Sequence, residues 1–437
     1  MGARRGTGGQ GIETPQAASD DPAKPLLRRY DAVRRRSEAL AAPLSAEDQQ
    51  VQSMPDASPA KWHLAHTTWF FETFLLKERL RGYRPFDADF AFLFNSYYEG
   101  VGPRHARPQR GLLTRPPLQE VMDYRRHVDA AMARLIAGPP DEAAAPLIAL
   151  GLNHEQQHQE LLLMDIKHAF SCNPIHPAYA PAAAAALRQA APLRWVGVDG
   201  GVRGIGHDGA GFAFDNEAPR HEVMLRDFRI ASRLVTNGEY LGFMRDGGYA
   251  RPEFWFMDGI ETVPREGWQA PLYWRERDGA WLEFTLSGLR PLDPGAPAGH
   301  VSYYEAAAYA AWAGKRLATE AEWECAAAAL PRDIERGANL LGSGKLHPAA
   351  AEDGGRQARQ MIGDLWEWTQ SAYSTYPGFR PAAGAIGEYN GKFMANQMVL
   401  RGGSCVTPPG HIRITYRNFF YPHQRWMFAG IRLAEDA

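Results

Sequence analysis

The chain changes its residue pattern between positions 176 and 193, and this change constrains the fold more than any other feature. From about residue 23 to 176, apolar residues recur three and four positions apart, the spacing of amphipathic helices. After Leu193, short strand-like runs alternate with glycines, tryptophans and turn residues. We therefore expect an α-helical domain followed by an irregular α+β domain.

Periodicity in the first part predicts helices near residues 26–40, 118–136 and 142–170, and the pair Ser58-Pro59 predicts a further helix start. Amphipathic helices of this size are typical of an antiparallel four-helix bundle, which often holds metal sites between facing helices. The connection 82–116 is too long for a simple bundle loop, which suggests a functional excursion.

Composition and pattern set the expected boundaries. Residues 1–22 are rich in Gly and polar residues and are expected to form a disordered tail. Residues 23–176 would form the bundle, residues 177–192 an Ala- and Pro-rich connector, and residues 193–437 the α+β domain.

Capping signals locate two helices in the second part. Ser302 with Glu305, and Thr319 with Glu322, stand in the capping-box relation, so each pair predicts a helix start. Strands are expected at 195–198 and near 220–225.

Charge and cysteine content exclude several classes. The formal net charge of −2 gives no broad electrostatic reason to bind nucleic acid or anionic lipid. No stretch has the apolar length of a membrane helix, and no apolar run follows the charged N-terminal residues as a secretory signal would require. Cys172, Cys325 and Cys405 are too scattered for a disulfide framework. We expect a cytoplasmic protein that needs neither nucleic acid, membrane nor an obligate protein partner.

The strongest chemical signal is the run HEQQHQE at residues 154–160. His154 and His158 are four positions apart and share one helix face, so their imidazoles can aim at one point. Such a pair also occurs as ordinary hydrogen-bonded core histidines, but a third histidine, His66 in the run WHLAH, favours a metal site. Three neutral imidazoles suit iron, zinc or copper.

These runs, together with motifs of the second half, carry a family resemblance. The first half resembles the DinB-like four-helix bundle. The second is similar to the formylglycine-generating-enzyme (sulfatase-modifying-factor, C-type-lectin-related) fold, through residues 314–324, 363–369, 400–404 and 429–433. In this order, the two domains resemble the EgtB-type, ergothioneine-biosynthetic sulfoxide synthases over roughly residues 24–435.

The resemblance implies a non-heme iron(II) enzyme that uses dioxygen. Such enzymes join a thiol sulfur to C2 of the imidazole of hercynine and oxidise the sulfur, which here would give hercynylcysteine sulfoxide. By position in the motifs, His66, His154 and His158 would be the iron ligands, with His63 outside this set. Gln157 would bind the hercynine carboxylate.

The C-terminal part supplies further expected substrate contacts. Asn418 matches a family residue that contacts hercynine, and Phe419 and Phe420 are candidates to hold its trimethylammonium group through cation–π attraction. Phe420 stands where the subgroup that uses γ-glutamylcysteine carries Asp. This departure favours free cysteine as the sulfur donor.

The excursion 82–116 supplies the expected catalytic tyrosines, Tyr97 and Tyr98, as in a second subgroup of the family. A phenol there could donate a proton during the oxygen chemistry. The tyrosine positions of the first subgroup align with Ile386 and Tyr389. Both Tyr97 and Tyr98 could instead simply pack the excursion against the second domain.

Arginines are the expected ligands of the cysteine carboxylate. The candidates are Arg107 and Arg110 of the excursion. Arg413, Arg417 and Arg425 are rivals, and the excursion arginines could also be solvated.

Three rival functions fit the sequence less well, and the first of them is rejected. A formylglycine-generating oxidase would need paired cysteines near the C-terminus, where only Cys405 lies. A zinc-dependent DinB-like thiol transferase would leave the second domain unexplained, and a non-enzymatic binding module would leave the histidines unexplained. Within the family, γ-glutamylcysteine or a selenosugar could replace cysteine as donor.

Overall fold

The computed structural model describes residues 23–139, 141–181, 189–331, 333–355, 357–383, 387 and 391–437. The expected tail at 1–22 and the centre of the expected connector, 182–188, lie outside the described residues.

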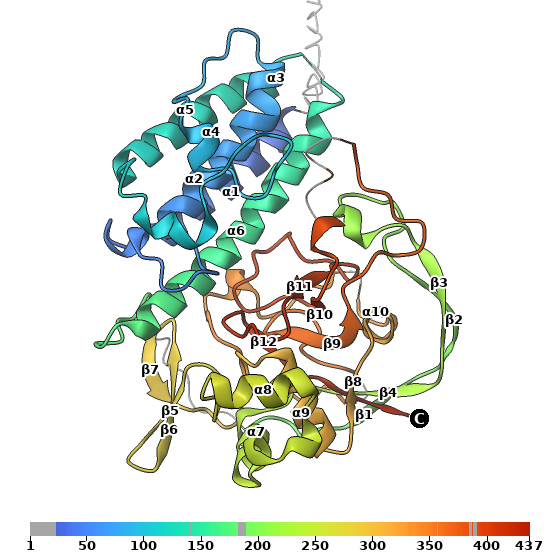
Figure 1. The fold of residues 1–437 in the computed structure, drawn as a ribbon. Helices are drawn as coiled ribbons and strands as arrows, with labels where there is room; N and C mark the ends of the chain where they lie inside the picture. The colour runs from blue at the N-terminus through green and yellow to red at the C-terminus, as the bar shows by residue number, and fades with distance from the viewer. Residues whose placement is uncertain are drawn as a thin grey trace, which may run out of the picture.

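The first half of the chain is helical (Figure 1). Its helices are α1 (Ala23–Ala41), α2 (Ala60–Phe71), α3 (Lys77–Arg79), α4 (Phe90–Leu93), α5 (Leu118–Ala137) and α6 (Ala144–Cys172), with a π-helical turn η2 (Glu72–Leu76) after α2 and a 3₁₀ turn η3 (Arg107–Leu112) in the excursion. Prolines precede α2 and α5, where a missing backbone N–H costs nothing, and Gly138 ends α5. Within the described residues, no helix is long and apolar enough to cross a membrane.

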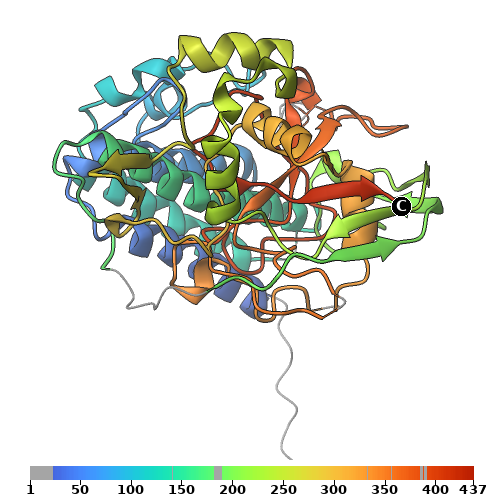
Figure 2. The same cartoon turned by 90° about the horizontal axis from the view of Figure 1, so that it is seen from below.

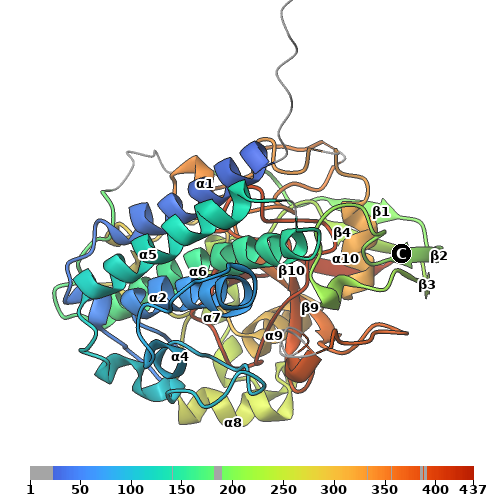
Figure 3. The same ribbon diagram turned by 90° about the horizontal axis from the view of Figure 1, so that it is seen from above.

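Helix α2 lies at the centre of the bundle and packs against α1, α5 and α6. Figure 3 shows these long helices side by side. Every residue of α2 is buried. Gly151 of α6 lets that helix approach closely, because a Cβ there would lie 2.7 Å from the ring of Phe71 and 2.9 Å from that of Phe70.

The second half is an irregular α+β domain. Its strands are β1 (Trp195–Val198), β2 (Gly201–Ile205), β3 (His221–Leu225), β4 (Phe228–Ala231), β5 (Trp274–Arg277), β6 (Ala280–Thr285), β7 (Gly288–Pro291), β8 (Arg316–Leu317), β9 (Trp366–Ala372), β10 (Met398–Arg401), β11 (Asn418–Phe420), β12 (Ala429–Gly430) and β13 (Leu433–Asp436). Its helices are α7 (Asn237–Arg245), α8 (Met257–Arg265), α9 (Tyr303–Trp312) and α10 (Glu320–Ala327).

These strands form small sheets with long-range connections. One sheet has the order β1-β4-β13-β8, and a second has the order β11-β10-β9-β12. Figure 2 shows the red C-terminal strand β13 beside green strands from the start of this domain. Strands β2 and β3 form a hairpin, and β5, β6 and β7 form a meander. The last residues of the chain therefore close the sheet that its first strands begin.

Both predicted capping boxes are present. The Ser302 hydroxyl accepts the N–H of Glu305 at 3.1 Å, and the Glu305 carboxylate accepts the N–H of Ser302 at 2.8 Å. Thr319 and Glu322 repeat these bonds at the start of α10. The sequence signals for α9 and α10 are confirmed.

Helix α6 joins the two halves (Figure 1). Gln157 donates to the hydroxyl of Tyr416 at 2.7 Å, and Glu160 accepts from the indole of Trp366 at 2.8 Å and from the hydroxyl of Thr407 at 2.7 Å. Helix α6 thus packs within the bundle and also contacts the second domain. The predicted fold class, a helical bundle followed by an irregular α+β domain, is confirmed.

Candidate metal centre

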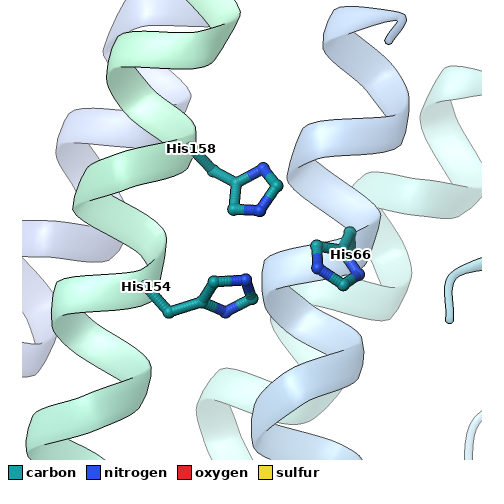
Figure 4. Close-up of side chains that lie close together, drawn as sticks. All are labelled: His66, His154 and His158. Atoms are coloured by element: carbon teal, nitrogen blue, oxygen red, sulfur yellow. The ribbon is translucent and has the colours of Figure 1, made fainter. Parts of the chain in front are cut away.

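Three histidines from two helices converge beside the seam between the domains. His66 lies on α2, and His154 and His158 lie one turn apart on α6. Each offers a ring nitrogen, and these nitrogens all lie within 4.8 Å of one another. Figure 4 shows the three rings turned toward a common point. The structure thus brings together all three residues that the sequence nominated as metal ligands.

The surroundings of His66 leave one nitrogen for a metal. Its Nδ1 lies 2.6 Å from the carbonyl oxygen of Phe94, so this nitrogen carries the proton and donates it. Its Nε2 is buried and has no hydrogen-bond partner among the described residues. A buried polar atom without a partner is unfavourable, and a bound cation would satisfy the lone pair.

The histidines are held in the neutral form that metal binding requires. Burial lowers the pKa of His154 to about 3. Burial, with a smaller contribution from His154, also holds the pKa of His66 and that of His158 well below the usual range. Neutral imidazoles keep their lone pairs available, so the residues present fit a transition metal such as iron or zinc.

His66 lies in a stack of aromatic side chains. On one side its ring stacks on Trp62, with centroids 4.5 Å apart, and the guanidinium of Arg110 lies 3.4 Å from the Trp62 ring centroid. The ring of His66 also stacks on Trp69 at 5.5 Å, and Trp69 contacts Tyr98 at 5.6 Å. One tryptophan therefore separates the histidine cluster from Arg110, and another separates it from Tyr98.

Arg110 is a buried cation, only 3 % exposed. It donates to the hydroxyls of Ser58 at 2.9 Å and Ser96 at 3.1 Å, and no carboxylate within the described ranges forms an ion pair with it. Burial, with a smaller contribution from Arg107, lowers the pKa of Arg110. An anionic ligand would offset the cost of burying this charge.

The other arginine candidates have different surroundings. Arg107 is exposed and donates to the backbone carbonyl of Asp56. Arg413, Arg417 and Arg425 are each paired with a carboxylate, of Glu217, Glu320 and Glu305 respectively. These pairings leave Arg110 as the candidate best suited to a substrate carboxylate.

Tyr97 and Tyr98 stack on each other, with ring centroids 4.7 Å apart. Tyr98 is fully buried, and Tyr97 also contacts the ring of Phe393 from the second domain at 5.0 Å. Burial raises the pKa of Tyr97 above its usual range, so its phenol keeps its proton. The alternative tyrosine position, Tyr389, and its neighbour Ile386 lie outside the described residues.

Gln157 meets a polar group that the sequence did not reveal. Its amide bonds to Tyr416, whose hydroxyl also lies 3.2 Å from Nε2 of His411. The other nitrogen of His411 lies 3.2 Å from the amide oxygen of Asn153. These hydrogen bonds link α6 to the second domain.

Asn418, Phe419 and Phe420 form the edge strand β11 and are half-buried. Phe419 stacks on Tyr373 at 4.1 Å, and Phe420 meets the ring of Trp426 edge-on at 5.6 Å. The indole of Trp426 therefore connects Phe420 with α6, because its N–H donates to the carboxylate of Asp165 at 3.0 Å.

The sequence did not identify His63 and Asp165 as partners of the cluster. Nδ1 of His63 lies 2.8 Å from Nδ1 of His158, and Nε2 of His63 lies 3.0 Å from Asp165. Their spacing along the helices could have indicated them. His63 precedes His66 by three positions and Asp165 follows His158 by seven, so each shares a face with a ligand.

The acidic residues beside the histidine pair form their hydrogen bonds and ion pairs with other parts of the protein. Glu155 is buried and pairs with Arg34 and Arg125. Glu160 is buried in the interface with the second domain, as described above. Both residues serve packing between elements.

Comparison with protein families divides the chain in the same way. The DinB superfamily model matches residues 29–169. The model of the sulfatase-modifying factor enzyme 1-like domain matches residues 182–353 and 352–437.

Curated relatives span nearly the whole chain. The chain is 35% identical over 404 residues to the hercynine oxygenase of Mycobacterium tuberculosis, with 87% of this chain and 92% of the relative covered. It is 34% identical over 409 residues to the hercynine oxygenase of Mycolicibacterium smegmatis, covering 88% and 92%. The formylglycine-generating enzyme of Streptomyces coelicolor is 30% identical over 308 residues, covering 59% of this chain and 95% of that enzyme.

Proposed function

Since the chain belongs to the hercynine oxygenase family, we propose that it is an iron(II)- and O₂-dependent sulfoxide synthase of ergothioneine biosynthesis. Its substrates would be hercynine and cysteine, and its product hercynylcysteine sulfoxide. The reaction forms one C–S and one S–O bond, with the second oxygen atom of O₂ leaving as water. We place this reaction in the cytoplasm.

The observation that carries this proposal is the cluster of His66, His154 and His158, with ring nitrogens within 4.8 Å. When bound there, iron(II) would supply the redox chemistry that activates dioxygen and would favour the thiolate form of cysteine. Ligands that are all neutral suit a site that must also accept a thiolate.

Arg110 would hold the carboxylate of cysteine. Its guanidinium is buried, lies against Trp62 and lacks a carboxylate partner within the described part of the chain. An arginine binds a carboxylate through two parallel hydrogen bonds, which would orient the thiol. Arg107, which is exposed, would attract the carboxylate of cysteine from solvent.

Hercynine would lie between α6 and β11. Gln157 and Asn418 would donate to its carboxylate, and the faces of Phe419 and Phe420 would hold its trimethylammonium group, which cannot donate a hydrogen bond. Gln157 now bonds to Tyr416, so binding would exchange that hydrogen bond for one to the substrate.

Phe420 would also select the sulfur donor. Its ring packs on Trp426 and offers no charge to the amine of a glutamyl group. We therefore propose that cysteine is preferred over γ-glutamylcysteine, and that a selenosugar is a further donor to be tested.

Tyr97 and Tyr98 would provide the proton that the oxygen chemistry consumes. Tyr98 is buried and Tyr97 is half-buried, their rings stack, and the raised pKa of Tyr97 keeps its phenol protonated. Burial also excludes water that could compete for that role.

The test loads the full chain anaerobically with iron(II), adds hercynine and cysteine, admits O₂, and follows the product by mass spectrometry. We expect a sulfoxide that depends on iron and O₂, faster turnover with cysteine than with γ-glutamylcysteine or a selenosugar, and loss of bound iron in His154→Ala. Zinc-dependent thiol transfer without O₂ would instead establish the thiol transferase function. Unchanged iron content in His154→Ala would exclude this metal site.

A further inference from the structure

His63 stands between a proposed metal ligand and a carboxylate. It is buried on α2, and each of its two ring nitrogens has one close partner. Nδ1 lies 2.8 Å from Nδ1 of His158, and Nε2 lies 3.0 Å from Oδ2 of Asp165. The contacts link Asp165, His63 and His158 in a row that ends at the metal cluster.

Asp165 is surrounded by donors. Its Oδ2 accepts the backbone N–H of Ser58 at 2.8 Å, and its Oδ1 accepts the indole N–H of Trp426 at 3.0 Å. A carboxylate in such a place can only accept hydrogen bonds. The proton of His63 must therefore be on Nε2, pointing at Asp165.

The position of the proton on His63 determines the position of the proton on His158. When its single proton is on Nε2, the ring of His63 offers a lone pair at Nδ1. That lone pair accepts the Nδ1–H of His158, which leaves the lone pair of His158 on Nε2. In the opposite arrangement, Nδ1 of His158 would accept from His63, and Nε2 would carry a proton and could not bind a cation.

We propose that His63 and Asp165 are positioning residues that fix the tautomer and ring orientation of His158 for metal binding. His158 needs them because its outer partner is an imidazole, which can either donate or accept. His66 has no such need, because its outer partner is the carbonyl of Phe94, which only accepts. The inference rests on the proposed metal site and assigns it residues outside the ligand set.

The row also ties the metal site to the second domain. Trp426 belongs to the segment that follows β11, and its indole N–H donates to Asp165. Its ring contacts Phe420, a proposed substrate contact. The orientation of His158 thus depends on a residue of the second domain.

The test measures binding of Co²⁺ alone, by competition with a chelator, in the full chain. We expect His63→Leu to weaken Co²⁺ binding about 10- to 100-fold, the usual effect of removing an outer hydrogen-bond partner of a metal ligand. His63→Asn should recover most of the affinity, since its amide oxygen can accept from Nδ1 of His158. His168→Leu changes a histidine of α6 that is bonded to Ser53; it is the control and should bind Co²⁺ as the wild type does.

A double-mutant cycle tests the role of Asp165. Asp165→Asn should weaken Co²⁺ binding when His63 is present and have little further effect beside His63→Asn, because the row is then already cut. Equal losses in both backgrounds would show a purely structural role and overturn the proposal.

Proton NMR of the Co²⁺-loaded protein in H₂O gives a readout of the tautomer itself. The Nδ1–H of a bound imidazole gives a strongly shifted signal that disappears in D₂O. We expect one such signal to be lost in His63→Leu and restored in His63→Asn. Unchanged affinity and signals in His63→Leu, with binding lost in His154→Ala, would overturn the row but keep the metal site. Equal binding by wild type and His154→Ala would overturn both.

Discussion

Lys167 of α6 is a cation that is buried against residues of the second domain. Its ammonium is fully buried, donates to Nε2 of His300 at 2.7 Å and lies 4.0 Å from Glu283. It also lies over the rings of Tyr273 and Phe428, at 4.7 and 4.8 Å. Burial outweighs the attraction of Glu283 and lowers the pKa of Lys167 from 10.5 to about 8.

This shift predicts an alkaline gain in stability. Between pH 8 and 10.5 the unfolded chain holds the Lys167 proton while the folded chain releases it, so the free energy of unfolding rises with pH in that window. Lys167→Met removes this contribution. We expect the wild type to gain up to about 3 kcal/mol relative to the variant across the window, measured by urea unfolding. Exposed Lys345→Met is the control, and parallel pH curves for wild type and Lys167→Met would contradict the prediction.

The tyrosine pair gives a second residue-scale prediction. Tyr97→Phe combined with Tyr98→Phe keeps both stacked rings but removes the proposed proton donors. We expect sulfoxide formation to fall about 10²- to 10⁴-fold, the usual contribution of a general acid, while Co²⁺ binding stays unchanged. Mass spectrometry and metal titration measure the two quantities separately. Undiminished sulfoxide output would assign the pair to packing alone.

The residue-scale predictions from sequence succeeded where the signal was local. The His154–His158 spacing is a property of one helix, so it could be recognised without the fold. His63 with Asp165, and Gln157 with Tyr416, are pairs from elements distant in sequence. No local rule connects such pairs, because the packing of α2, α6 and the second domain decides them.

At the element scale, Gly151 sets how closely α6 approaches α2. Gly151→Ala would place a methyl group 2.7 Å from the ring of Phe71, which must then move. Phe70, also in contact, packs on His154 with ring centroids 4.9 Å apart. We expect a loss of about 1–3 kcal/mol in the free energy of unfolding and weaker Co²⁺ binding, since His154 would shift relative to His66.

The matched control for this prediction is Gly242→Ala in α7. A Cβ at Gly242 would meet Trp312 at 3.7 Å, an ordinary contact. That variant should be neutral or gain up to about 1 kcal/mol from helix propensity. Thermal unfolding compares the two, and equal behaviour of Gly151→Ala and Gly242→Ala would show that the close approach does not matter.

Elements with local start signals were predictable, and strand pairing was not. The capping boxes located α9 and α10, and the strand at 195–198 coincides with β1. In contrast, β13 lies between β4 and β8, which precede it by more than a hundred residues. Pairing over such separations depends on how the whole domain packs, so neither alternation nor turn residues reveal it.

At the scale of the whole molecule, motifs predicted which two domains are present but not how they meet. The interface between the domains includes a surface of α6 whose polar residues bond to the second domain. Glu160 is an example. Its Oε1 accepts from Trp366 at 2.8 Å and from Ser404 at 2.6 Å, and its Oε2 accepts from Thr407 at 2.7 Å. One carboxylate thus serves three donors of the second domain.

Removing that carboxylate should loosen the two domains from each other. Glu160→Ala leaves the buried Trp366 N–H without its acceptor, at a cost of about 1–3 kcal/mol, and opens a cavity at the seam. Glu160→Gln should be milder, because the Thr407 hydroxyl can rotate to accept from the new amide. We expect a lower unfolding temperature and faster proteolysis between the domains, in the order wild type, Gln, Ala. Exposed Glu142→Gln, just before α6, is the control. If Glu160→Ala unfolds at the wild-type temperature, the hydrogen bonds of Glu160 do not hold the domains together.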